Sequence, residues 1–117
     1  MSDAADREIR LAFWKIHILH HAASQDVYGL WILEELAAHG HRLSPGTIYP
    51  ILARMERNGW LRSTSEGSGK ARRNYRITPA GRRLLAELSE QLVELYQEVA
   101  LGKHPTKRPR RPRKPRS

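Results

Sequence analysis

Apolar residues recur at helical spacing in four stretches of the chain, and two shorter stretches have the spacing of strands. The first helix is expected from about Asp6 to about Ala23, and the second from Val27 to His39. The first helix is apolar on two sides, one made of Ile9, Ala12, Phe13, Ile16 and Leu19, and the other of Leu11, Trp14, Ile18 and Ala22. One side can pack within its own domain. In a chain this short the outer side, which includes Trp14, calls for a second subunit.

The third helix is expected within Pro45 to Asn58, with Gly59 as its stop. Its apolar positions fall on one face: Ile48, Ile51, Leu52 and Met55. Pro50 leaves two alternatives for its start. If Thr47 is the cap, Pro50 falls in the first turn, where its missing N–H does no harm. If Ser44 is the cap, Pro50 lies inside the helix and kinks it. We favour Thr47 as the cap.

A β-hairpin and a long fourth helix are predicted to follow. The strands are expected at Trp60 to Glu66 and Ala71 to Ile77, around a glycine-containing tip. Thr78 followed by Pro79 is a strong helix start, and this last helix should run to about Leu101. Its apolar residues form a heptad seam that predicts a dimer arm: Leu85, Leu88, Leu92, Leu95 and Val99.

Together these elements predict a mainly α fold with a small β-hairpin, namely a winged helix-turn-helix plus a C-terminal dimerisation helix. Residues 1–78 would form the DNA-binding domain and residues 79–102 the dimerisation helix. Residues 103–117 would be a disordered basic, proline-rich tail. The expected homodimer uses the first and fourth helices, with an interface made of Phe13, Trp14 and the five seam residues.

The net charge of +9 is unevenly distributed along the 117 residues. Residues 103–117 contain eight Lys or Arg and no acidic residue. Within the rest of the chain, residues 54–83 carry nine basic and two acidic residues, whereas residues 84–102 carry four Glu and no base. A localised basic patch is a better indication of nucleic-acid binding than a high isoelectric point, although a solvated basic surface gives the same charge pattern.

The candidate DNA-binding residues lie on the third helix and the hairpin. On the helix they are Ser44, Thr47, Tyr49, Arg54 and Arg57, because hydroxyls and helix N-termini suit phosphates and Arg can read guanine. On the hairpin they are Lys70, Arg72 and Arg73, which should approach the DNA backbone or minor groove. Tyr49 can also be interpreted as a core residue, and an ordinary amphipathic surface helix remains the structural alternative.

Other classes of function find little support. No catalytic motif, metal motif or cofactor loop is present, so we expect a non-enzyme without cofactor or metal. His17 and His21 have a spacing that can bind metal, but no carboxylate or thiol completes a ligand set. No apolar run is long enough to cross a membrane, and the absence of Cys fits a cytoplasmic protein.

Several short motifs resemble the PadR family of bacterial transcriptional regulators. The match runs from about Leu11 to Val99 and rests on Tyr28-Gly29-Leu30, Gly46-Thr47-Ile48-Tyr49-Pro50-Ile51-Leu52, Met55-Glu56 with Asn58-Gly59, and Arg73-Asn74-Tyr75-Arg76-Ile77-Thr78 with Gly81. Asn74 departs from the pattern, since the family often has a second aromatic there. The single C-terminal helix resembles the smaller subgroup.

This resemblance implies a homodimer on double-stranded DNA, with the third helix in the major groove. It also implies repression, often of a neighbouring transporter or detoxification gene, that a small-molecule effector relieves. We expect a roughly palindromic operator, for which the protein's own promoter is a candidate. One alternative is a general architectural or nucleoid-type protein that binds DNA chiefly through the basic tail. Another is an adaptor whose winged helix binds a protein, although the basic face offers few apolar anchors for a partner.

Overall fold

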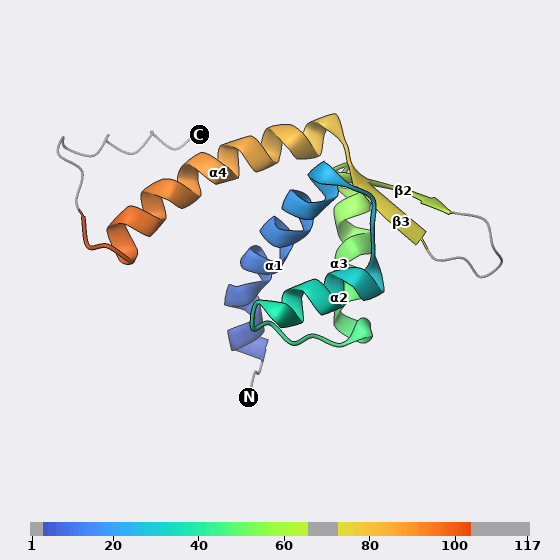
Figure 1. The fold of residues 1–117 in the computed structure, drawn as a ribbon, viewed down its shortest axis with the longest axis horizontal. Coiled ribbons are helices and arrows are strands. Elements are labelled where there is room, and N and C mark those ends of the chain that lie inside the picture. Colours follow the sequence, from blue (N-terminus) through green and yellow to red (C-terminus); the bar gives the residue numbers. More distant parts are fainter. Residues whose placement is uncertain (1–3, 66–72, 104–117) are drawn as a thin grey trace, which may run out of the picture. The chain divides into compact units, whose positions relative to one another are not determined.

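The computed structural model describes residues 4–65 and 73–103 (Figure 1). It contains α1 (Ala4–Ser24), β1 (Val27–Tyr28), α2 (Gly29–Ala38), α3 (Pro45–Arg57), β2 (Leu61–Ser65), β3 (Arg73–Ile77) and α4 (Pro79–Val99). The strands form one antiparallel sheet in the order β1-β3-β2. The chain divides between Glu87 and Leu88 into two compact units. The predicted fold class is confirmed, with a third strand added to the hairpin.

The added strand corrects the predicted start of the second helix. Val27 and Tyr28 were expected to be helical, but they pair with Tyr75 and Asn74 of β3. Val27 is 1% exposed, so extended backbone here buries a β-branched side chain and gives β3 a second pairing partner. The helix α2 therefore begins only at Gly29.

The hydrophobic core of the first unit lies among α1, α2, α3 and the sheet. The predicted buried face of α3 is confirmed, because Ile48, Leu52 and Met55 are fully inaccessible and Ile51 is 6% exposed. Leu61, Tyr75 and Ile77 add the inward side of the hairpin. Burial on this scale fixes the face that α3 turns to solvent.

The two sides of α1 are assigned differently from the prediction. Trp14 is only 4% exposed and lies in the core with Ile18, Leu19 and Ala22. It was expected on the outer side and at the dimer interface, and this placement is wrong because α1 packs that side of its surface on β3 and α2. Ile9 and Phe13 instead remain exposed, at 71% and 47%.

The start of α3 also differs from the option we favoured. Ser44 is the N-cap and Pro45 the first helical residue, so Pro50 lies inside the helix. The Ser44 carbonyl already accepts hydrogen bonds from the amides of Thr47 and Ile48, at 2.9 and 3.1 Å, so the helix is under way before Thr47. Pro50 offers no N–H to the Gly46 carbonyl, but Gly46 is exposed and solvent can satisfy that carbonyl.

The junction of hairpin and last helix matches the prediction. The Thr78 hydroxyl accepts a hydrogen bond from the Gly81 amide at 3.0 Å and donates one to the Gly59 carbonyl at 2.6 Å. Thr78 thus caps α4 and ties its first turn to the end of α3. Gly59 has φ of +85°, a conformation that favours glycine and ends α3.

Most residues of α4 are exposed to solvent or only half-buried. Gly81 is its one buried residue; Leu85, Leu88 and Leu92 are half-buried, and Leu95 and Val99 are 53% and 73% exposed. In the part of the chain described, no helix is both long and apolar enough to span a membrane.

Candidate nucleic-acid interface

The exposed face of α3 carries the residues predicted to bind DNA. Ser44, Tyr49, Arg54 and Arg57 are exposed and Thr47 is half-buried, so the structure brings this group together on one helix. The Ser44 and Thr47 hydroxyl oxygens lie 3.3 Å apart at the helix N-terminus, where the first turn holds no acidic residue. Hydroxyls beside a positive helix end offer donors for a phosphate.

The two arginines of α3 lie at its other end. Arg54 and Arg57 occupy the last turn, where a positive charge also interacts favourably with the helix dipole. The Arg54 side chain has no hydrogen-bond or ion-pair partner among residues 4–65 and 73–103. Arg54 is exposed, and a guanidinium can make a bidentate contact with a base edge.

Tyr49 lies against the first residue of α2. A Cβ atom on Gly29 would stand 2.3 Å from Tyr49 Cε1 and 2.8 Å from its hydroxyl oxygen. The residue is nevertheless 46% exposed. The hydroxyl end of the Tyr49 ring therefore lies against Gly29, which explains why glycine follows Tyr28.

We expect Gly29→Ala to destabilise the protein by about 1–3 kcal/mol, because the new methyl group overlaps the Tyr49 ring. Urea unfolding measures the loss, which should vanish in a Tyr49→Ala background. Gly46→Ala is the matched control, since its Cβ would meet only Ser44 Oγ, at 3.7 Å. Equal effects of both glycine substitutions would contradict this packing.

The hairpin contributes Arg73, while Lys70 and Arg72 lie outside the described residues. Arg73 is exposed and its Nη1 donates a hydrogen bond to Ser63 Oγ at 3.1 Å. Two other arginines counted in the basic segment are already engaged. Arg76 Nε pairs with Asp26 Oδ1 at 2.7 Å, and Arg82 Nη2 donates to the Ala23 carbonyl at 3.2 Å. Of these two arginines, only Arg76 has its charge paired with that of an acidic residue.

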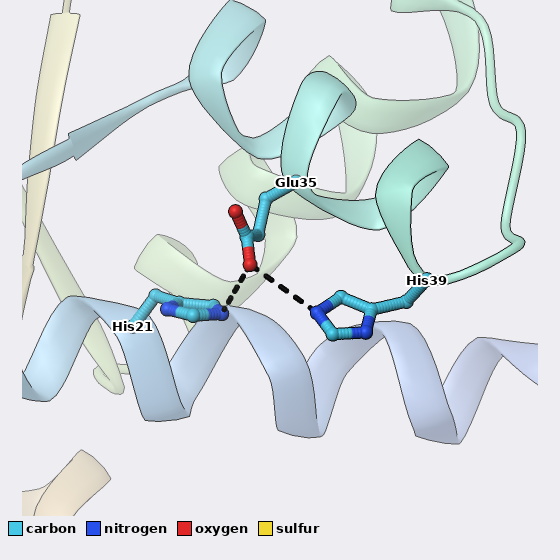
Figure 2. Close-up of polar contacts among 3 residues, drawn as sticks. All are labelled: His21, Glu35 and His39. Atoms are coloured by element: carbon cyan, nitrogen blue, oxygen red, sulfur yellow. Dashed lines mark hydrogen bonds and ion pairs between the residues drawn. The ribbon is translucent and has the colours of Figure 1, made fainter.

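The structure also assembles histidines that sequence spacing leaves apart. Glu35 Oε2 on α2 lies 3.5 Å from His21 Nε2 on α1 and 3.3 Å from His39 Nε2 (Figure 2). The His17 ring centroid is 5.1 Å from that of His39 and 5.8 Å from that of His41. The fold thus brings Glu35, which is distant from His21 in the sequence, within reach of two histidines. Even so, no group of side chains among the described residues has an arrangement that could hold a metal ion.

This cluster makes stability dependent on pH. Burial, followed by the proximity of His39, His41 and further histidines, lowers the pKa of His17. Burial and His20 likewise lower the pKa of His21, although Glu35 opposes this. The folded protein therefore binds fewer protons at these sites than the unfolded chain. The stability they contribute is present above about pH 6.5 and is lost as pH falls through the lowered values.

We accordingly expect a lower Tm at pH 5.5 than at pH 7.5, measured by circular dichroism. His17→Gln should reduce the difference, because it removes the group whose protonation all four neighbouring histidines oppose. An unchanged difference in that variant would exclude His17 as a source of the pH dependence.

Comparison with known proteins places this arrangement in a family. The model of the transcriptional regulator PadR-like family matches residues 18–87. The transcriptional regulator Rv3488 of Mycobacterium tuberculosis (strain ATCC 25618 / H37Rv) is 50% identical over 101 residues, which cover 86% of this chain and 94% of that protein.

Solved structures agree with the sequence match. A PadR family regulator from Eggerthella lenta DSM 2243 is 32% identical with a TM-score of 0.71, covering 80% of this chain and 84% of that one. A PadR-like regulator from Bacillus cereus strain ATCC 14579 is 27% identical with a TM-score of 0.72, covering 80% and 94%. The chain belongs to the PadR-like family of transcriptional regulators.

Proposed function

We propose that this regulator is a homodimeric repressor that reads a two-fold symmetric operator with α3. The observation that carries the proposal is the division of α3 into a buried apolar face and a face with exposed arginines and hydroxyls that are exposed or half-buried. A helix held on one side by a core presents its other side rigidly, as base readout requires. DNA binding of this kind needs no catalytic group, so the protein acts as a non-enzyme.

The proposed homodimer rests on apolar surface that the described chain leaves open. On α1 this surface includes Ile9 and Phe13, and on α4 it includes Leu95 and Val99. Along α4 itself, the other seam residues are the half-buried Leu85, Leu88 and Leu92. A second copy that covers these residues would remove them from water and would present two copies of α3 to one duplex.

Relief of repression by a small molecule is the remaining part of the proposal. Membership of the family supports relief by a small molecule. The regulator would act in the cytoplasm, and its own promoter would be one of its targets. The helix α4 contains one aromatic residue, Tyr96, which is 57% exposed. An effector that stacks on an aromatic ring of this helix would therefore have to use Tyr96.

The alternative is an architectural protein that binds DNA mainly through residues 103–117. Their eight basic residues would add affinity that is independent of base sequence and sensitive to salt. Fluorescence anisotropy can separate the two proposals by comparing the full chain with a chain truncated after Gly102. If the protein is a repressor, the truncated chain should still bind an operator-sized duplex from its own promoter more tightly than a shuffled duplex. Loss of nearly all affinity on truncation would favour the architectural protein.

A further inference from the structure

The inward face of the hairpin changes from apolar to polar along its length. Leu61 pairs with Ile77, and Ser63 pairs with Tyr75. Because side chains alternate along a strand, Ser63 lies on the same face as Leu61, and Arg73 lies on the same face as Tyr75 and Ile77. The apolar members of this face are 2–5% exposed. Ser63 and Arg73 therefore extend the core-facing side of the hairpin toward its tip.

These two polar side chains connect to α3 through a chain of hydrogen bonds. Ser63 Oγ donates to Glu56 Oε2 of α3 at 2.7 Å, in a part-buried contact. Arg73 Nη1 donates to the same Ser63 oxygen at 3.1 Å. One serine hydroxyl thus links α3, β2 and β3.

The Tyr75 side chain lies beside the same two charged residues. Burial raises the pKa of this phenol, Arg73 acts to lower it and Glu56 acts to raise it. Both charges therefore lie close enough to the Tyr75 hydroxyl to affect its ionisation, although they come from different elements. Glu56, Ser63 and Arg73 therefore form one cluster beside the buried Tyr75.

In the sequence of α3, Glu56 lies between the two exposed arginines that are proposed to bind DNA, Arg54 and Arg57. A carboxylate directed at DNA would be repelled by the phosphates. Glu56 is half-buried instead and is engaged by Ser63. Arg73 has five N–H donors and Ser63 accepts one of them, so donors remain for a phosphate oxygen.

We propose that Glu56 and Ser63 are positioning residues that hold the Arg73 guanidinium at a fixed place beside α3, where it contacts a DNA phosphate. This inference rests on the proposed function, because it assumes that α3 and the hairpin bind one duplex. The positioning acts through Arg73, and neither Glu56 nor Ser63 needs to touch DNA.

The test is the affinity of the full-length protein for operator DNA over a range of salt concentrations. Ser63→Ala leaves the net charge unchanged, yet we expect affinity to fall by about three- to tenfold. The slope of log K against log salt should become shallower by about one, as it should for Arg73→Ala, because one phosphate contact is lost. Ser63→Thr keeps a hydroxyl at this position, so its affinity and slope should match those of the unmodified protein.

Thr64→Ala is the matched control. Thr64 is the next residue of β2, is exposed and lies on the opposite face, so removing its hydroxyl should change neither affinity nor slope. Glu56→Ala provides a second, independent test. Electrostatics alone predicts tighter binding when a negative charge is removed, whereas loss of positioning predicts weaker binding.

The possible failures can be told apart. If Arg73→Ala weakens binding and flattens the slope while Ser63→Ala does neither, the positioning inference is overturned and the proposed function stands. Tighter operator binding by Glu56→Ala also overturns the inference. If Ser63→Ala does not fold, the affinity of Glu56→Ala alone tests the inference. If neither Arg54→Ala nor Arg73→Ala changes operator affinity, the proposed function itself fails, and the inference fails with it.

Discussion

Leu92→Glu is expected to convert the protein to a monomer and to weaken operator binding by about 100-fold or more. Leu92 lies in the middle of the α4 seam and is half-buried within its own chain. A carboxylate there would have to lose its hydration in the proposed dimer contact, with no cation in the neighbouring sequence of α4 to pair with it. The large effect on DNA binding follows because linked half-site contacts multiply in affinity, and a monomer makes only one of them.

Sedimentation velocity and anisotropy would measure the two effects on the same sample. Gln97→Glu is the matched control, because it adds the same charge to α4 at an exposed position away from the seam. It should remain dimeric and bind normally. A Leu92→Glu protein that sediments as a dimer would show that the subunit interface lies elsewhere.

Arg54→Ala is expected to reduce operator affinity by about 1–3 kcal/mol and to relax base preference at one position of each half-site. The reason is the exposed guanidinium at the end of α3, which has no partner in the described part of its own chain. The measurement is competition between the operator and variants of it with single base-pair changes. Arg54→Ala should distinguish fewer of these variants than the unmodified protein.

Arg7→Ala serves as the control for charge, because Arg7 is an exposed arginine on α1. It should leave the order of preference among the variant duplexes unchanged. If Arg54→Ala instead weakens all duplexes by the same factor, Arg54 contacts the backbone and does not read bases.

Sequence periodicity was sufficient to predict the face that α3 buries. Ile48, Ile51, Leu52 and Met55 recur at helical spacing, and each is within 6% of complete burial. The helix start was harder, because Ser44 and Thr47 are both good capping residues and Pro45 and Pro50 suit different starts. The choice is made by backbone hydrogen bonds to the Ser44 carbonyl, which the residue types alone do not specify.

Pairings between distant parts of the chain account for the other errors. β1 is two residues long and exists because β3 offers it an edge. Trp14 was placed outward because α1 is apolar on both sides, and only tertiary packing determines which side is covered by its own chain. The same limit applies to Glu35 between His21 and His39, to Asp26 with Arg76, and to Gly29 under Tyr49. Apart from the Glu35–His39 pair, which is four residues apart, each of these contacts joins segments that are distant in the sequence.

The most direct test of sequence-specific reading by α3 is selection from a pool of randomised duplexes at physiological salt. The full-length protein would be incubated with the pool, and the bound DNA would be sequenced against the starting pool. The proposed dimer predicts one enriched motif with two-fold symmetry, whose information content falls when Arg54→Ala replaces the unmodified protein. Bound DNA with the same sequence distribution as the starting pool would contradict base reading by α3.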